Sequence, residues 1–92
     1  IRTFKCKETE KVFGRRRSPK IPADIQRIAM RKLVALNAAP SLNALRIPPG
    51  NRLETLSADR EGQHSIHIND QWRICFTWRE GNAYDVEISD YH

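Results

Sequence analysis

The chain has 92 residues and a net charge of +5, enough for a single domain, residues 1–92, with a modest core. It has neither an apolar run long enough to cross a bilayer nor a signal-peptide pattern, so we expect a cytoplasmic protein. The excess of Lys and Arg favours a polyanionic partner, nucleic acid before acidic protein. Because the sequence begins at Ile1 and not at Met, we expect at least one residue upstream.

The N-terminal half predicts one strand and two helices. Residues 1–6 alternate weakly and predict a short strand, and residues 7–13 predict a helix that stops at Gly14. A second helix should start near Pro22 and end at Ala38 or Ala39, because the following proline disfavours continuing it. Its apolar residues recur at a spacing of three and four and form one buried stripe: Ile25, Ile28, Ala29, Leu33 and Leu36.

The C-terminal half changes to a period of two. A rigid turn at residues 48–51 is followed by four predicted strands with polar turns between them: residues 53–56, 63–68, 72–78 and 84–90. The predicted fold class is therefore α+β, in the order β-α-α-β-β-β-β, with the helices packed on one face of a mainly antiparallel sheet.

Alternation along the strands assigns side chains to the two faces of this sheet. The apolar set should point at the helices: Ile66, Ile68, Trp72, Ile74, Phe76, Trp78, Tyr84, Val86 and Ile88. The opposite face should carry the hydrogen-bonding and titratable set: Ser65, His67, Arg73, Cys75, Thr77, Arg79, Asp85, Glu87, Ser89 and Tyr91. We expect the functional site on this second face.

A basic protein that binds nucleic acid and cuts RNA without a metal needs a base, a fixed cation and an acid. Histidine suits the proton steps and arginine suits the phosphorane charge. A terminal histidine such as His92 ordinarily belongs to a frayed end, but the apolar residues of the last strand tie this terminus down. Tyr91 beside it offers a ring that can stack on a base.

Arg73 and the other two histidines admit structural as well as functional interpretations. Arg73 can pair across the sheet with Glu87, or it can present its guanidinium on the open face, and both can hold together. His67 shares the face of Arg73 but can also be an ordinary hydrogen-bonded surface group. His64 should fall on the helix side or at the edge of its strand.

Other chemistries find little support in the sequence. No pair of histidines has metal-ligand spacing, so no zinc site is expected. The serines lack the context of a nucleophile elbow or a triad. Cys6 and Cys75 are interpreted as buried reduced thiols in preference to a disulfide. One set of basic residues most simply forms solvated loops, but would contact RNA phosphates if it faces RNA: Arg15, Arg16, Arg17, Lys20, Arg52 and Arg60.

Three segments together resemble the HigB branch of the RelE/ParE toxin superfamily. They are Pro48-Pro49-Gly50-Asn51-Arg52-Leu53-Glu54, Gly62-Gln63-His64-Ser65-Ile66-His67-Ile68-Asn69-Asp70-Gln71-Trp72-Arg73-Ile74-Cys75-Phe76, and Asp85-Val86-Glu87-Ile88-Ser89-Asp90-Tyr91-His92. The resemblance covers nearly the whole chain and implies a RelE-like fold. It further implies a toxin that enters the ribosomal A site and cleaves mRNA without a cofactor, leaving a 2′,3′-cyclic or 3′-phosphate.

The resemblance also implies partners and residue roles. The cognate partner would be a HigA-like antitoxin with a helix-turn-helix domain, and the complex would bind operator DNA. Arg73 matches the position of the phosphate-stabilising arginine in the family, and Glu54 matches a position where some relatives have a general base. The C-terminal catalytic segment of the family matches Asp90, Tyr91 and His92. His67 stands where relatives commonly have arginine.

Three other possibilities remain as alternatives. ParE-type members of the superfamily share the fold and act on gyrase, so this chain can be a non-catalytic toxin of that kind. It can also be a basic nucleic-acid-binding module, or a toxin whose activity has decayed. Arg73 and the Asp90-Tyr91-His92 ending favour the ribonuclease.

Overall fold

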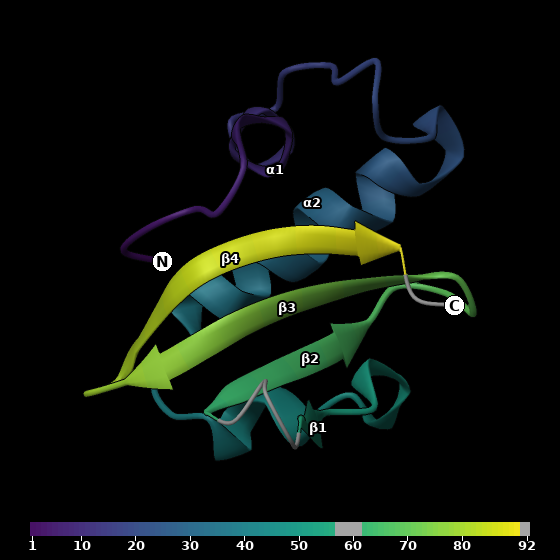
Figure 1. The fold of residues 1–92 in the computed structure, drawn as a ribbon. Coiled ribbons are helices and arrows are strands. Elements are labelled where there is room, and N and C mark those ends of the chain that lie inside the picture. Colours follow the sequence, from purple (N-terminus) through teal and green to yellow (C-terminus); the bar gives the residue numbers. More distant parts are fainter. Residues whose placement is uncertain (57–61, 91–92) are drawn as a thin grey trace.

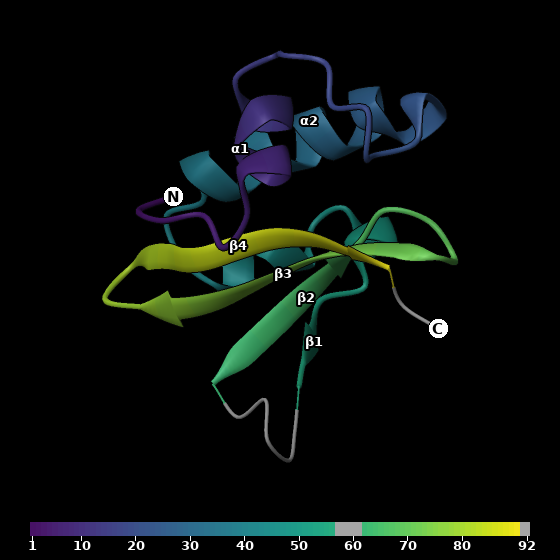
Figure 2. The ribbon, with the colours of Figure 1, turned by 45° about the horizontal axis from the view of Figure 1, so that its top comes forward.

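The computed structural model describes residues 1–56 and 62–90, which form a four-stranded sheet with a pair of helices packed on one face (Figure 1). The helical elements are α1 (Lys7–Phe13), α2 (Ala23–Ala38) and the short 3-10 turns η1 (Asn43–Arg46) and η2 (Pro49–Asn51). The strands are β1 (Glu54–Thr55), β2 (Gln63–His67), β3 (Trp72–Arg79) and β4 (Asn82–Asp90). They lie in the order β1-β2-β3-β4, each antiparallel to the next. Figure 2 shows α1 and α2 together on one side of the sheet, so the predicted α+β class is confirmed.

The helices follow the local signals of the sequence. α1 ends before Gly14, whose N–H donates to the carbonyl of Glu10, and α2 starts directly after Pro22. The predicted stripe of α2 faces the sheet: Ile25, Ala29, Leu33 and Leu36 are buried, and Ile28 is half-buried. None of the helices in the described residues is long and apolar enough to cross a membrane.

The prediction of a strand at residues 1–6 is wrong. This segment runs beside β4, but it forms only one parallel bridge, between Phe4 and Val86. Backbone hydrogen bonds from Arg2 to Ala83 and from Lys5 to Val86 fasten it to the sheet. The chain enters α1 immediately after Cys6, so too few residues remain for a regular ladder.

Two predicted strands are shorter in the structure. β1 covers only Glu54–Thr55 of residues 53–56, and β2 stops at His67. Beyond His67, the amides of Ile68 and Asn69 both donate to the carbonyl of Trp72 and begin the turn into β3. The turn predicted at residues 57–62 lies, up to residue 61, outside the described residues.

The prediction that Tyr84 faces the helices is wrong, because a β-bulge changes the register of β3 against β4. Cys75 pairs with Glu87, but Thr77 pairs with Tyr84, so β4 carries one extra residue between the two pairs. Asp85 lies in this bulge with a φ of 51°. Tyr84 therefore shares the face of Thr77, where the Arg79 guanidinium lies 4.4 Å from its ring centroid.

The core between the helices and the sheet makes the strands a rigid support. Its fully buried members include Leu33 and Leu36 of α2, Ile66 of β2, and Ile74 and Phe76 of β3. Each such side chain contributes about 1.5–3 kcal/mol by leaving water. The polar side chains on the opposite face of the same strands are consequently held in fixed positions.

Candidate functional site

Strand pairing brings polar side chains together on the open face, which is the sheet face opposite α1 and α2 (Figure 1). Glu54 of β1 pairs with Ser65 of β2, and His67 of β2 pairs with Arg73 of β3. Cross-strand partners point to the same side of a sheet. These four residues and Arg52, which lies between η2 and β1, are called the open-face cluster below.

Among the described residues, Ser65 and Glu54 hold Arg73. Its Nη1 donates to the hydroxyl of Ser65 at 3.2 Å and lies 3.3 Å from Oε2 of Glu54. Ser65 is fully buried, the Arg73 side chain is 14% exposed and the Glu54 side chain is 49% exposed. The guanidinium thus has a buried support on one side and a half-exposed carboxylate on the other, which fixes its orientation.

The predicted partner Glu87 is not the residue that binds Arg73. Arg73 stands opposite Ser89 in the register, and Glu87 stands opposite Cys75. The carboxylate of Glu87 instead lies 3.7 Å from Nζ of Lys5. A structural ion pair of Arg73 does exist, but β1 supplies it through Glu54 and β4 does not supply it through Glu87.

Burial and nearby cations favour the neutral form of His67. Burial lowers the pKa of His67 below its usual value near 6.5, and the charges of Arg52 and Arg73 lower it further, while Asp70 opposes them. Its Nδ1 is buried, and no group in residues 1–56 or 62–90 forms a hydrogen bond with it. Such a nitrogen can accept or donate a proton when a substrate group reaches it.

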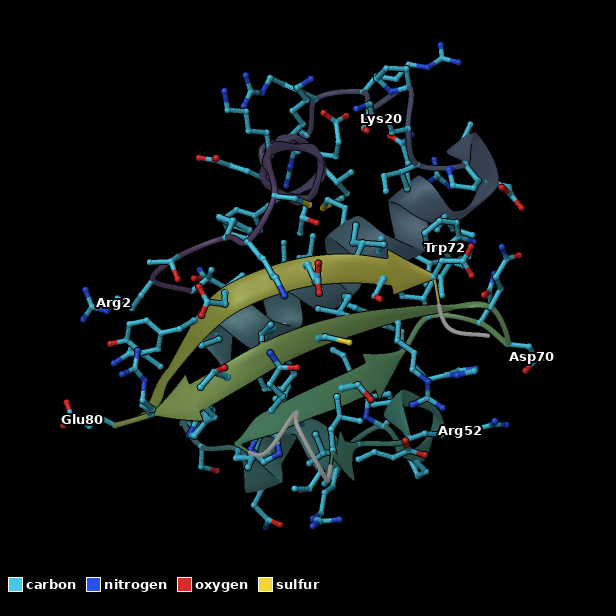
Figure 3. The ribbon with its side chains drawn as sticks, in the orientation of Figure 1. Arg2, Lys20, Arg52, Asp70, Trp72 and Glu80 are labelled. Atoms are coloured by element: carbon cyan, nitrogen blue, oxygen red, sulfur yellow. The ribbon has the colours of Figure 1, made fainter. Side chains whose placement is uncertain are left out.

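Of the predicted RNA contacts that fall in the described residues, Arg52 is the member of the open-face cluster. It adopts a left-handed conformation with φ 45° and ψ 54° directly after η2. Its side chain is exposed, and its charge is the largest electrostatic influence on the pKa of His67. Figure 3 shows Arg52 and Asp70 at the same end of the sheet, with Glu80 at the opposite end.

The connector between α1 and α2 does not reach this cluster. Figures 1 and 2 both show it on the helix side of the molecule, away from β1. The side chain of Gln26 binds the backbone of Ser18 and Ile21 and so holds the connector in place. The exposed basic residues of this connector are Arg15, Arg16, Arg17 and Lys20. The three arginines line a groove of about 330 Å³ over Val12 and Met30.

The remaining candidates have mixed outcomes. Asp90, at the end of β4, pairs with Trp72 and accepts a hydrogen bond from Gln71 at 3.2 Å. His64 pairs with Phe76 on the helix side, as predicted, and its Nδ1 lies 3.1 Å from the hydroxyl of Thr55. The other three candidates, Arg60, Tyr91 and His92, lie outside the described residues.

Sequence reasoning missed Lys32 and Asn51. Lys32 of α2 donates from Nζ to Oδ1 of Asn51 at 2.6 Å, at the end of the sheet where β2 stops. Lys32 falls at helical spacing from Ala29 and Leu36, so a lysine at this point of the buried stripe was a usable signal. The charge of Lys32 also acts on His67.

Metal ligands do not gather in the described stretches of the chain. Within residues 1–56 and 62–90, no three His, Cys, Asp or Glu side chains are arranged to hold a metal ion. The side chain of Cys75 is buried, as predicted, whereas that of Cys6 is only half-buried. The chemistry that the described side chains offer is therefore that of a fixed guanidinium, a neutral imidazole and a carboxylate.

The fold and the open-face cluster define a small basic α+β protein with fixed cations and titratable side chains on one face of its sheet. The chain belongs to the HigB-like toxin family, whose model is described as the RelE-like toxin of the type II toxin–antitoxin system HigB and matches residues 2–92. A type II toxin implies an antitoxin as its partner.

Curated relatives agree over most of their lengths. Toxin HigB-1 of Vibrio cholerae serotype O1 (strain ATCC 39315 / El Tor Inaba N16961) is 38% identical over 89 residues, which are 96% of this chain and 94% of the relative. Endoribonuclease HigB of Proteus vulgaris is 36% identical over 93 residues, covering 100% and 99%. An uncharacterized protein of Haemophilus influenzae is 29% identical over 72 residues, covering 78% and 71%.

Proposed function

We propose that this toxin is a metal-independent endoribonuclease that cleaves mRNA in the ribosomal A site and thereby stops translation in the cytoplasm. The name of the Proteus vulgaris relative supports the reaction class. The observation that carries the proposal is the position of Arg73, fixed by Ser65 and Glu54 beside His67, whose buried Nδ1 has no hydrogen-bond partner among the described residues.

The proposed reaction is transfer of the phosphoryl group to the neighbouring 2′-oxygen. A base removes the proton of the 2′-hydroxyl, and O2′ attacks phosphorus. The P–O5′ bond then breaks, and an acid protonates O5′, which leaves a 2′,3′-cyclic phosphate and a 5′-hydroxyl. Arg73 stabilises the additional negative charge of the phosphorane because its planar group grips two phosphate oxygens.

The C-terminal segment and the open-face cluster provide the candidate groups for the two proton transfers. His92 acts as acid or base, Tyr91 stacks on a base of the RNA, and Asp90 orients a neighbour in this terminal segment. Glu54 and His67 are the further candidates for the proton steps. A neutral His67 suits the base role because its pKa is held below the usual value.

A purified translation reaction with one defined mRNA tests the reaction class. We expect new RNA ends at the A-site codon with the wild-type chain, mapped by primer extension. Arg73→Ala should lower the rate by about 100-fold or more, as the loss of a preorganised charge contact does. Arg79→Ala is the matched control, because Arg79 lies on the same strand and face but contacts Tyr84 at the far end.

Other outcomes point to the alternatives. A wild-type chain that stops translation without new RNA ends would contradict the nuclease proposal. A chain that instead blocks supercoiling by purified gyrase would be a toxin of the ParE kind. If cleavage survives deletion of His92, the role of that residue is wrong and the reaction class stands.

We also propose that the antitoxin carries a helix-turn-helix domain and that operator DNA is bound only through the complex. The protein encoded by the reading frame beside this gene is the candidate antitoxin. Co-purification of the two chains, and a gel shift of the upstream DNA that needs both, are the expected results. A shift produced by this chain alone would contradict the assignment.

A further inference from the structure

Lys32 is placed where the pattern of α2 favours an apolar side chain. It is half-buried on a helix whose stripe otherwise packs against the sheet. Burial lowers the pKa of Lys32 from its usual value, and the charge of Arg31 lowers it further. A helix position that departs from its own pattern is a sign of a functional requirement, because an apolar residue there would pack without this desolvation.

The ammonium group of Lys32 is held by an amide and not by a carboxylate. Its Nζ donates to Asn51 Oδ1 at 2.6 Å, and the side chain of Asn51 is itself anchored through Nδ2 to the carbonyls of Leu45 at 3.1 Å and Ile47 at 3.4 Å. Asn51 is 4% exposed. None of the salt bridges formed among residues 1–56 and 62–90 involves Lys32. The structure therefore fixes a partly buried cation whose charge the described carboxylates leave unmatched.

The ammonium lies in a groove that adjoins the open-face cluster. The groove has a volume of about 240 Å³ and is lined by Arg31, Lys32, Ala35, Pro48 and Asn51. The chain continues from Asn51 directly into Arg52 of the cluster. The charges of Lys32, Arg52 and Arg73 all act on His67, so the groove and the cluster share one positive field.

We infer that this groove binds a phosphate of the RNA backbone next to the scissile phosphate, and that Lys32 and Arg31 are its RNA-binding residues. The inference rests on the proposed nuclease function, since it extends the same substrate beyond Arg73. Lysine binds phosphate as a point charge, and Arg31 supplies a second cation at the rim of the groove. Backbone contacts of this kind position a nucleic acid without selecting its sequence.

Binding and cleavage are measured separately to test this. The probe is a ribosome programmed with an mRNA whose A-site codon carries 2′-deoxy sugars, which the proposed reaction cannot cleave. Lys32→Met keeps the length of the stem and removes the charge, and Lys32→Arg keeps the charge. Lys7→Met is the control for net charge, because Lys7 is exposed on α1 and does not line the groove. Thermal melting confirms that each variant is folded.

We expect Lys32→Met to bind the probe about tenfold more weakly, as the loss of a charge-assisted contact does. The slope of log affinity against log salt should fall by about 0.7, the value for one phosphate on a single strand. Lys32→Arg should restore both, and Lys7→Met should change neither. The loss on Lys32→Met should be the same for every A-site codon.

Three results would overturn the inference: a folded Lys32→Met with wild-type affinity and salt slope, an equal loss with Lys7→Met, or a loss confined to particular codons, which marks a base contact. The proposed function is tested by a different measurement, the cleavage of an unmodified A-site codon. It fails if the wild-type chain leaves that codon uncleaved, whatever affinity the Lys32 variants have for the deoxy probe.

Discussion

Ser65→Ala removes the buried support of Arg73 and leaves its carboxylate partner. The hydroxyl of Ser65 is fully buried and accepts from Arg73 Nη1 at 3.2 Å. After the substitution the guanidinium keeps Glu54, whose side chain is half exposed and therefore less confined. The substitution thus tests whether the orientation of Arg73 matters, because the guanidinium itself is still present.

The expected size follows from burial. A hydrogen bond from a charged donor contributes about 1.5–3 kcal/mol, and losing one partner of a buried group costs about 1–3 kcal/mol. Because the Arg73 side chain is 14% exposed and keeps one acceptor, we place the loss in unfolding free energy toward the lower end, about 1–2 kcal/mol. In a domain of this size that lowers the Tm by about 5–15 °C.

Cleavage should fall as well, by about tenfold, because a phosphate-binding group that moves by a fraction of an ångström stabilises the phosphorane less. Ser89→Ala is the matched control. Ser89 flanks Arg73 from β4, and among the residues that the structure describes its hydroxyl makes no hydrogen bond. Urea melts and single-turnover cleavage are compared for the two variants. Equal losses from both would refute the argument that Ser65 holds the guanidinium.

Three further predictions concern the same sheet. Burial and nearby charges lower the pKa of His67, so the imidazole binds a proton more readily in the unfolded chain than in the folded one. The free energy of unfolding should therefore fall as pH drops below about 6.5, and urea melts should show a smaller fall at acid pH for His67→Gln. An unchanged acid slope would contradict this. Glu54→Gln should cost less than about 1 kcal/mol in urea melts, because the ion pair is half exposed, yet lower cleavage by about 100-fold if the carboxylate is the base. A full cleavage rate would leave Glu54 only as a partner of Arg73. Gly81→Ala should cost about 1 kcal/mol, since φ is +78° while nothing lies within 4 Å of the new Cβ, and cleavage should be unchanged at this far end of the sheet.

Local signals were sufficient for the helices and most of the strands. Gly14 and Pro22 mark the end of α1 and the start of α2, since each acts through its own backbone. The face of Tyr84 was not predictable from alternation, because the bulge at Asp85 depends on how β3 and β4 pair. The prediction of a strand at residues 1–6 was wrong for a related reason. The pairing of this segment is set by a strand near the other end of the chain and not by its own pattern.

The site was predictable as a face but not as a set of contacts. Alternation alone places His67 and Arg73 on the same face, and the register of β2 and β3 then pairs them directly. The partner of Arg73 was missed because only the pairing of β1 with β2 carries Glu54 to it. The contact of Lys32 was missed because Asn51 reaches it through tertiary packing, from a turn after α2.

The structural and the functional interpretations of Arg73 are joined by the unequal burial of Ser65 and Glu54. A phosphate that approaches from solvent competes with Glu54, which is half exposed, and leaves the buried Ser65 contact intact. The guanidinium then keeps its orientation while its anionic ligand is exchanged. In the proposed reaction the exchange also releases the carboxylate beside the incoming ribose, where it can accept a proton. The same ion pair that orders the toxin without substrate would then become two catalytic groups when RNA binds.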